Sequence, residues 1–598
     1  MAEINYKEIG LKCGLEIHQQ LDTQKLFCSC PSQLYDGEPD FVMKRRIRAV
    51  AGETGDVDVA AMHEMQKEKQ YVYEGIFQNT CLVETDEEPP HDINHYALQI
   101  ALQVAKMTSA KFVDQIQVMR KTVADGSNTS GFQRTALIAR DGIIAVNGKH
   151  IRIPTICIEE DAARIIKDAK HFTVYRLDRL GIPLIEIATH ADIATPQMCR
   201  EVAEYLGMLL RSTGKVKRGL GTIRQDVNVS IKGGARIEIK GAQDLKQLQL
   251  LVENEVLRQI SLLELKRTLM LPKKTIAIKE ATELFANTNV NILRDKPVFG
   301  IKLEHFKGFL KKEIQPNKRL GTELSDYAKT KGVLGLFHSD ETLENYGLTK
   351  EEIKHTADFF ELEKDDAFIL IAEEKKIAEK ALQAVIDRIY LLFEKIPSEV
   401  RRANIDGTST YLRPMPGSSR MYPETDVKPV IPETENIEIP QLLEEKKDDY
   451  KKAGLSEDLA KLAVKKGIAL DDLMRNYPNV DPVFLAYYFL NMPKEIKKRF
   501  TIEVDVRKYA VELLTKVNKE EIPQEAVIDI VVSLAQGHKV NYSAYAFSEH
   551  DFKETMRRIV AEHPDATVSG LMGEAMKVLR GRVPGKKVMD MLKQLKEE

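Results

Sequence analysis

The hydrophobic pattern of this chain changes along its 598 residues, and this change constrains the fold more than any other feature. Up to about residue 270, segments such as IRIPTICIEED and DVNVSIKGGARIEIKG alternate apolar with polar residues and end at turn residues, as strands do. Helical patterns interrupt them at HYALQIALQVAKMTSAK and TPQMCREVAEYLGMLLRSTG, where Thr195 and Pro196 form an N-cap and a first turn. We therefore predict a multidomain α+β protein whose first domain contains a mixed, mainly antiparallel sheet.

The pattern after residue 280 divides the rest of the chain. Residues 281–400 combine strand-like KPVFGIKLEHFKGFL with helical EEKKIAEKALQAVIDRIYLLFEK, which indicates an α/β domain inserted into the first domain. The turn-rich segment 401–440 is too short to be a domain, so we expect it to return the chain to the domain begun by residues 1–280. Amphipathic helices follow, and we divide this all-α tail into residues 441–520 and 521–598.

The composition describes a folded protein without a strong overall charge. The formal net charge is −3, so any nucleic-acid contact must come from local patches. One such patch follows Leu571, where seven Lys and Arg residues outnumber four acidic residues. No apolar run approaches the ~20 residues of a membrane span, and MAEINYKEIG lacks the pattern of a secretory leader. We expect a cytoplasmic protein without membrane contact.

Several carboxylates interrupt otherwise apolar strand segments. In GLEIHQQ, Glu16 and His18 are two residues apart and share one face of a strand. Glu186 stands between two isoleucines in PLIEIATHADI, and Glu160 in CIEEDAARI faces the side opposite to its acidic neighbours. Taken singly, each of these groups fits a solvated strand edge or a salt bridge to an arginine, because an unpaired buried charge is costly.

Convergence of these groups would favour a divalent cation as their common partner. Glu16, Glu160 and Glu186 supply oxygen ligands, which favour Mg²⁺ or Mn²⁺. The single His18 shifts the preference toward Mn²⁺ or Zn²⁺. The sequence therefore predicts a possible metal site without fixing the metal.

A second dense stretch, MRKTVADGSNTSGFQRT, places small hydrogen-bonding residues between cations. Arg120 and Lys121 precede the loop of residues 125–131, and Arg134 follows it. Such a loop suits phosphate or carboxylate recognition. It lacks the GxxxxGK[ST] pattern of a P-loop, so the motif alone is weak.

The six cysteines all lie in the first third of the chain and are too sparse for a disulfide framework, so we interpret them as thiols. Cys28 and Cys30 make only half of a zinc site, because structural zinc needs four ligands and no second closely spaced pair follows. We therefore do not expect zinc and interpret this pair as part of a packed turn.

Five of these motifs occur in order in one known family. GLEIHQQLDTQKLFCSC, ETDEEPPH, MRKTVADGSNTSGFQRT, IEEDAARI and LDRLGIPLIEIATHADI resemble the B and E subunits of glutamyl-tRNA(Gln) amidotransferases, over essentially the whole chain. The inserted domain and DGSNTSGFQRT resemble the archaeal E branch. The resemblance implies a catalytic cradle domain, an insertion similar to that of bacterial-type aspartyl-tRNA synthetases, and a tail made of a helical and a YqeY-like domain.

The resemblance implies an ATP-dependent carbon–nitrogen ligase that acts on Glu-tRNA(Gln). ATP would phosphorylate the side chain of the attached glutamate, and ammonia would then displace phosphate to give Gln-tRNA(Gln). An asparaginase-like partner, the D subunit of these amidotransferases, would supply the ammonia through a tunnel, in a heterodimer or a dimer of heterodimers. This chain shows no nucleophile constellation for amide hydrolysis, which fits that division of labour.

The resemblance also implies a metal site. A Glu-x-His pair, the second Glu of an E-E-D run and the Glu of an L-I-E-I strand carry over to Glu16, His18, Glu160 and Glu186. Mg²⁺ is the expected ion, with Mn²⁺ as an alternative, because phosphoryl transfer depends on charge neutralisation.

Catalytic roles follow from the same resemblance. We assign them to Lys121, Glu160 and Glu186, and Lys121 would either stabilise the acyl phosphate or receive ammonia. From charge alone, Arg120 and Arg134 would bind the phosphates of ATP.

One departure and two rival functions stand beside this interpretation. Where bacterial B subunits often carry a second CxxC, residues 45–58 read RRIRAVAGETGDVD, which again argues against zinc.

The rival functions are a tRNA-binding scaffold without catalysis and a synthetase-like enzyme that activates free glutamate.

Overall fold

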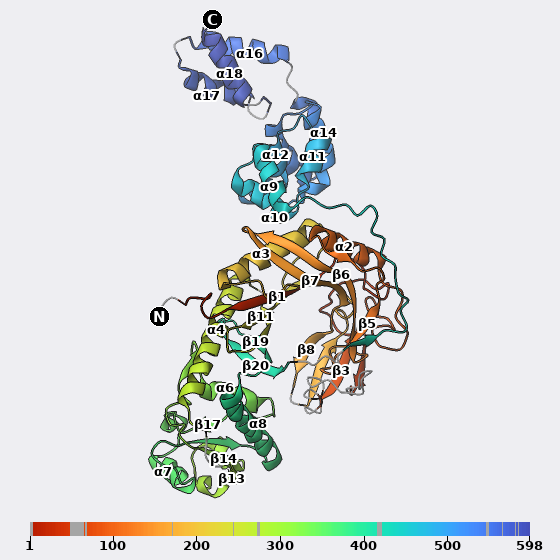
Figure 1. The fold of residues 1–598 in the computed structure, drawn as a ribbon. Helices are drawn as coiled ribbons and strands as arrows, with labels where there is room; N and C mark the ends of the chain where they lie inside the picture. The colour runs from red at the N-terminus through yellow and green to blue at the C-terminus, as the bar shows by residue number, and fades with distance from the viewer. Residues whose placement is uncertain are drawn as a thin grey trace. The chain divides into compact units, whose positions relative to one another are not determined.

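The computed structural model describes residues 4–47, 62, 65, 69–169, 171–242, 244–271, 275–415, 421–545, 549–564, 566–579, 582–583 and 585–597 (Figure 1). The chain forms two compact units, Met1–Pro440 and Gln441–Glu598, with separate hydrophobic cores. None of the helices within these described ranges is long and apolar enough to cross a membrane.

An eleven-stranded sheet forms the centre of the first unit. Its strands are β1 (Lys12–Gln20), β4 (Lys111–Phe112), β5 (Val118–Thr122), β6 (Phe132–Val146), β7 (Lys149–Glu160), β10 (Pro183–Ala188), β11 (Ile223–Ser230), β12 (Ile237–Ala242), β19 (Glu399–Ala403), β20 (Ser409–Pro414) and β21 (Met421–Pro423). The order is β20-β19-β12-β11-β1-β10-β7-β6-β5-β21, with β4 beside β6. Only β12 and β19 pair in parallel among the described strands of this sheet, which confirms the predicted mixed, mainly antiparallel sheet.

Three helices pack against one face of this sheet: α2 (His95–Met107), α3 (Pro196–Ser212) and α4 (Leu245–Thr268). The predicted start of α3 is confirmed, because the Thr195 side chain accepts a hydrogen bond from the backbone N–H of Met198. Leu15 and Ile17 of β1 are buried in the core on this helix-covered face. Because side chains alternate along a strand, the intervening polar residues of β1 lie on the other face, which we call the open face.

The first unit also contains a smaller sheet, in which the strand order is β2-β3-β9-β8. Its strands are β2 (Phe41–Arg45), β3 (Gln70–Gly75), β8 (Arg164–Asp168) and β9 (Phe172–Arg176). The hydroxyls of Tyr71, Tyr73 and Tyr175 donate hydrogen bonds of 3.1, 2.7 and 2.7 Å to the backbone carbonyls of residues 124–126. This sheet therefore fixes the start of the loop that the sequence singles out for anion recognition.

Residues 278–394 contain a further four-stranded sheet with the order β13-β14-β18-β17 and a short β15-β16 hairpin. These strands are β13 (Ile278–Glu280), β14 (Val298–Leu303), β15 (Glu313–Gln315), β16 (Lys318–Arg319), β17 (Phe337–His338) and β18 (Ala367–Ala372). The helices are α5 (Asn291–Arg294), α6 (Leu320–Lys329), α7 (Lys350–Phe359) and α8 (Lys375–Glu394), with 3-10 turns η1 (Thr282–Phe285) and η2 (Leu343–Tyr346). The predicted strand and helix are confirmed as β14 and α8, whereas the likeness to a synthetase domain stays a prediction.

A buried ionic cluster joins this segment to the main sheet. Glu323 of α6 lies 2.7 Å from Arg258 of α4, 3.1 Å from Arg388 of α8 and 3.0 Å from Arg401 of β19. All four side chains are at most 1% exposed. Beyond it, β19, β20 and β21 lie in the main sheet, so these three strands share the sheet begun by β1.

The described residues of the second unit form helices and no strands, which confirms the all-α character of the tail. The helices are α9 (Leu443–Lys452), α10 (Glu457–Lys466), α11 (Leu470–Asn476), α12 (Pro482–Leu490), α13 (Met492–Phe500), α14 (Ala510–Asn518), α15 (Val527–Ala535), α16 (Glu549–Glu562), α17 (Val568–Leu579) and α18 (Gly585–Glu597), with 3-10 turns η3 (Val506–Tyr509), η4 (Gln524–Ala526) and η5 (Tyr542–Ala544). Two hydrophobic cores lie in this unit, one between Tyr450 and Val532 and one between Phe552 and Leu592. The helical and YqeY-like assignments of these two parts stay predictions.

Candidate functional site

The strand register brings several predicted residues together on the open face of the main sheet. His18 of β1 stands opposite Glu186 of β10, and Glu186 stands opposite Cys157 of β7. Glu159 follows two residues after Cys157 and therefore points to the same face. Neighbouring strands thus contribute carboxylates to one patch, although they are far apart in sequence.

This patch, which we call the open-face cluster, contains the side chains of Glu16, His18, Lys121, Glu159 and Glu186. The Nε2 atom of His18 lies 3.9 Å from Glu16 and 3.5 Å from both Glu159 and Glu186. The Nζ atom of Lys121 lies 3.3 Å from Glu159 and 3.5 Å from Glu186. Glu159 is only 2% exposed, whereas Lys121 is 17% exposed, so one edge of the cluster is open to solvent.

Crowding of carboxylates shifts the proton affinities of this cluster. Burial and the nearby charge of Glu186 raise the pKa of Glu16 to about 7. Burial alone would lower the pKa of His18, but hydrogen bonding to Glu186 and the charges of Glu159 and Glu186 raise it to about 9. Burial also raises the pKa of Glu159, while Lys121 and His18 overcome burial and lower the pKa of Glu186. The three acids of the cluster thus outnumber its two cationic side chains, His18 and Lys121.

The donor set of the cluster fits a divalent cation. Ligand atoms of Glu16, His18 and Glu186 all lie within 4.8 Å of one another. Two carboxylates and an imidazole suit Mg²⁺ or Mn²⁺, and an added positive charge would relieve the repulsion among the acids. Three of the four predicted ligands are therefore brought together, and the identity of the metal stays a prediction.

Glu160 does not join the open-face cluster, contrary to the expectation from the resemblance. Its carboxylate accepts a 2.9 Å hydrogen bond from the backbone N–H of Arg134 and lies 3.5 Å from that residue's guanidinium. Side chains alternate along β7, so the consecutive Glu159 points to the open face instead. The family resemblance pointed to Glu160 and missed Glu159. The alternation of side chains along a strand is the sequence signal that distinguishes these two glutamates.

Arg120 and Arg134 also lie on the helix-covered face. They stand opposite each other on β5 and β6, and both pair with Glu424, Arg134 at 2.8 Å. Their guanidiniums lie 4.7 and 5.1 Å from the ring centre of Phe132. Because Lys121 follows Arg120 directly, its side chain projects to the opposite face. The structure therefore separates the predicted phosphate-binding arginines from the open-face cluster.

The two arginines line a surface pocket of about 390 Å³. The other lining residues are Asp86, Glu87, Glu88, Pro89, Pro90, Phe132 and Asp426. Glu424 and Asp426, which hold Arg120, come from the segment after β21, and reasoning from local sequence patterns missed them. In the sequence, these two acids are visible only as the acidic PETD stretch, which does not indicate that Arg120 is their partner.

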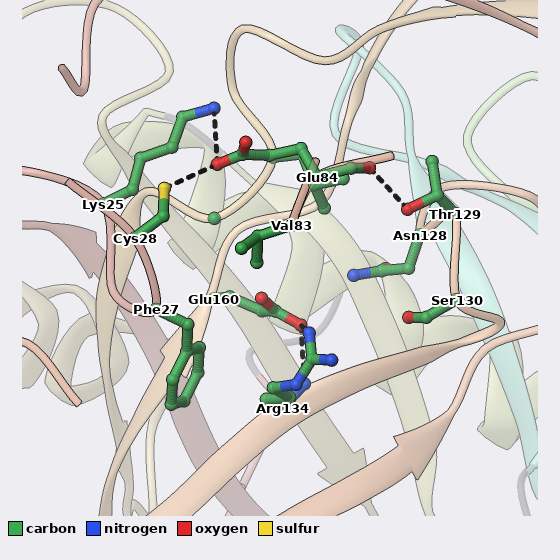
Figure 2. A pocket seen from close by; sticks show the side chains of 12 residues that line it. Lys25, Phe27, Cys28, Val83, Glu84, Asn128, Thr129, Ser130, Arg134 and Glu160 are labelled. Carbon is green, nitrogen blue, oxygen red and sulfur yellow. Dashed lines mark hydrogen bonds and ion pairs between the residues drawn. The ribbon is translucent and has the colours of Figure 1, made fainter. Parts of the chain in front are cut away.

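A small cavity of about 10 Å³ lies near Arg134 and Glu160 (Figure 2). Lys25, Glu84 and Asn128 also line it. This volume is about the minimum that holds one water molecule. The buried Nδ2 atom of Asn128 has no hydrogen-bond partner among the described residues, so a water is the natural occupant.

A second acidic group adjoins the open-face cluster. Oxygen atoms of Glu16, Asp226 and Glu238 lie within 4.8 Å of one another. The Nζ atom of Lys240 lies 2.7 Å from Asp226 and 2.6 Å from Glu238. Burial opposes the charge on Asp226, but the Lys240 ammonium lowers the pKa of this carboxyl below its usual value. This group is thus already neutralised in part by a lysine.

Comparison with known proteins identifies one family. The profile of the GatB/GatE catalytic domain matches residues 11–438. The chain is 43% identical to the E subunit of the glutamyl-tRNA(Gln) amidotransferase of Methanocaldococcus jannaschii, over 100% of both chains. It is 43% identical to the E subunit of Archaeoglobus fulgidus, over 99% of this chain and 98% of that one. It is 41% identical to the E subunit of Sulfurisphaera tokodaii, over 99% of each chain.

Proposed function

Because the chain belongs to the GatB/GatE family, and to its E branch, we propose that it is the subunit that amidates Glu-tRNA(Gln) in a glutamyl-tRNA(Gln) amidotransferase. It would act in the cytoplasm as an ATP-dependent carbon–nitrogen ligase. The single observation that carries this proposal beyond the family name is the open-face cluster.

The proposed reaction has two steps. An oxygen of the glutamate side chain attacks the terminal phosphorus of ATP, the bond to the ADP oxygen breaks, and ADP leaves. Ammonia then attacks the carbonyl carbon of the acyl phosphate, phosphate leaves with the bonding electrons, and loss of one proton gives the amide of Gln-tRNA(Gln).

The open-face cluster supplies charges suited to the first step. Glu16, His18 and Glu186 would hold Mg²⁺, with Glu159 beside them. Magnesium, when bound, neutralises phosphate charge in phosphoryl transfer. Lys121, between Glu159 and Glu186, would keep these carboxylates oriented and present its ammonium toward the phosphoryl group.

Arg120 and Arg134 remain candidates for contact with ATP, although their position weakens that role. Both are paired with Glu424 on the face opposite to Lys121. An anionic group in their pocket would have to share them with this carboxylate. A role in positioning β5 and β6 fits these contacts at least as well.

We also propose a partner subunit and a tRNA contact, which the names of the relatives do not specify. Ammonia would come from an asparaginase-like D subunit in a heterodimer or a dimer of heterodimers, and the tail would contact tRNA. Exposed lysines of α18 suit phosphate contacts.

The substitution Glu186→Gln tests the proposal. ATP-dependent formation of Gln-tRNA(Gln), with the ammonia-supplying partner or with added ammonium, should fall at least about 100-fold because a cation ligand is lost. Affinity for tRNA should be unchanged. The matched control is Glu204→Gln, which alters an exposed carboxylate of α3. Full turnover by Glu186→Gln would favour the scaffold function instead.

A further inference from the structure

Three cysteines and one glutamate converge at a site that the proposed reaction does not use. Cys28 and Cys30 lie in the turn after β1, and Cys81 and Glu84 lie in the loop between β3 and α2. Their sulfur and carboxylate atoms all lie within 4.8 Å of one another. The expectation that Cys28 and Cys30 make only half of a site is wrong, because the fold brings two more ligand-type side chains to them.

Backbone and side-chain contacts fix this arrangement. The Cys28 thiol donates to one carboxylate oxygen of Glu84 at 2.9 Å, and the Cys30 sulfur lies 4.0 Å from the other oxygen. The backbone N–H of Cys81 also donates to Glu84, at 2.8 Å. Glu84 is 4% exposed and Cys28 is 8% exposed, whereas Cys30 and Cys81 are half-buried, so the site is closed on one side and reachable from solvent on the other. Figure 2 shows Glu84 between the Cys28 sulfur and Lys25.

The geometry and chemistry of these four side chains match one class of ligand. Tetrahedral Zn²⁺ binds thiolates at about 2.3 Å, which places neighbouring donors about 3.8 Å apart. Donors within 4.8 Å of one another need only small rotamer adjustments to reach that spacing. Thiolate ligands favour zinc over magnesium or calcium, and a complete four-ligand set is typical of a structural zinc site.

The charge around the site agrees with this ligand. Three thiolates and a carboxylate would carry four negative charges, and burial of such a group requires compensating cations. The Nζ atom of Lys25 lies 3.2 Å from Glu84, and the Lys25 side chain is fully buried. One lysine leaves an excess of negative charge that a divalent ion would offset.

We propose that Cys28, Cys30, Cys81 and Glu84 bind a structural zinc ion. The ion fastens the loop around residues 81–84 to the turn around residues 28–30, segments that are more than 50 residues apart along the chain. This site is separate from the open-face cluster and does not depend on the proposed reaction. Of residues 45–58, the segment whose sequence contains no second cysteine pair, residues 48–58 lie outside the described residues.

The proposed ion would also fix a loop near the small cavity. The backbone carbonyl of Glu84 accepts a 2.7 Å hydrogen bond from the hydroxyl of Thr129 (Figure 2). Thr129 belongs to the small-residue loop whose other end is held by the three tyrosines of the smaller sheet. Zinc at Glu84 would therefore hold this loop at a second point.

The test is metal analysis of the purified full-length chain, with and without its ammonia-supplying partner. We expect one zinc per chain by mass spectrometry and its release after a mercurial reagent modifies the thiols. Cys81→Ser should lose the zinc, and Glu84→Gln should lower zinc affinity at least about tenfold. Cys199→Ala, which removes a buried thiol elsewhere, should retain one zinc per chain.

A spectroscopic measurement keeps the proposal falsifiable if Cys81→Ser fails to fold. Cobalt(II) substituted into the wild-type chain should give the intense visible absorption of tetrahedral thiolate coordination, and zinc should displace it. A metal-free chain that also fails to bind cobalt in this way would overturn the proposal. Stoichiometric iron in place of zinc, or a disulfide between any two of Cys28, Cys30 and Cys81, would equally overturn it.

Discussion

Glu159 and Glu160 are consecutive residues of β7, yet their carboxylates lie on opposite faces of the main sheet. Glu159 lies 3.5 Å from His18 in the open-face cluster, whereas Glu160 pairs with Arg134 on the helix-covered face. The two residues therefore have different neighbours, and we expect their substitutions to have different effects. From the E-E-D run alone, either glutamate could be the metal ligand.

The pair of substitutions Glu159→Gln and Glu160→Gln separates these roles. We expect Glu159→Gln to weaken Mn²⁺ binding at least about tenfold, measured by electron paramagnetic resonance of free Mn²⁺, because a buried carboxylate beside the ion is neutralised. Glu160→Gln should retain Mn²⁺ affinity and lower the free energy of unfolding by about 1–3 kcal/mol, since Arg134 loses a buried partner. Loss of Mn²⁺ binding in Glu160→Gln alone would contradict this assignment and restore the one that motif resemblance gives.

Local patterns predicted the parts of the fold that depend on local physics. The N-cap Thr195 and the alternation in β1 are encoded within a few residues, and both are confirmed. Helix α4 had no such signal, because Glu255, Arg258 and Gln259 interrupt the apolar pattern on its buried side. These side chains bond to one another, and Arg258 also pairs with the distant Glu323. Hydrophobic periodicity does not detect a helix whose buried face carries paired charges.

Long-range register explains why the site was only partly predictable. That Glu16 and His18 share a face follows from their spacing, but the placement of β10 and β7 beside β1 does not. The pairing of Arg120 with Glu424 spans 304 residues and leaves no local pattern. The convergence of Cys81 and Glu84 on Cys28 and Cys30 could not be predicted for the same reason.

The raised pKa values in the open-face cluster predict a pH-dependent metal affinity. A cation must displace the protons held by Glu16, whose pKa is about 7, and by His18, whose pKa is about 9. Mn²⁺ affinity in the absence of ATP should therefore rise about tenfold per pH unit between pH 7 and pH 9, and more steeply below pH 7. Titrations at four pH values measure this slope, and Glu16→Gln should remove only the steeper part. An affinity that is independent of pH would contradict the prediction.

The same two groups give the metal-free protein an opposite pH dependence. Folding raises the pKa of Glu16 above its usual 4.5 and that of His18 above its usual 6.5, so the folded state binds these protons more tightly. Their contribution to stability is complete below the unfolded pKa values and is lost as pH rises through about 7 and about 9. Urea midpoints in a chelator should therefore fall from pH 6 to pH 9, and saturating Mn²⁺ should reduce or reverse this fall.

The buried ionic cluster around Glu323 predicts a large stability effect far from the open-face cluster. Burial would raise the pKa of Glu323, but the charges of Arg401, Arg258 and Arg388 lower it. Glu323→Gln leaves three buried guanidiniums short of one negative charge, and we expect a loss of about 3–5 kcal/mol in the free energy of unfolding. Urea denaturation of the first unit measures this loss.

The control for this prediction is Glu379→Gln on the exposed side of α8, which should change stability by less than about 0.5 kcal/mol. Because the pKa of Glu323 is depressed on folding, its contribution is present above about pH 4.5 and is lost as pH falls further. The destabilisation caused by Glu323→Gln should therefore shrink in acid. A loss below about 1 kcal/mol at pH 7 would show that the arginines find other partners.

Removal of residues 546–598 tests whether the end of the tail binds tRNA. The hydrophobic core between Phe552 and Leu592 lies entirely within this segment, and the core between Tyr450 and Val532 lies entirely before it. The shortened chain should therefore stay folded and retain Mn²⁺ affinity. We expect weaker tRNA binding and a smaller salt dependence, because each lost phosphate contact lowers the slope of log affinity against log salt by about 0.7–0.9. The full-length triple substitution of Lys586, Lys587 and Lys593 by Glu should reproduce both effects, and unchanged salt dependence in both variants would place the tRNA contacts elsewhere.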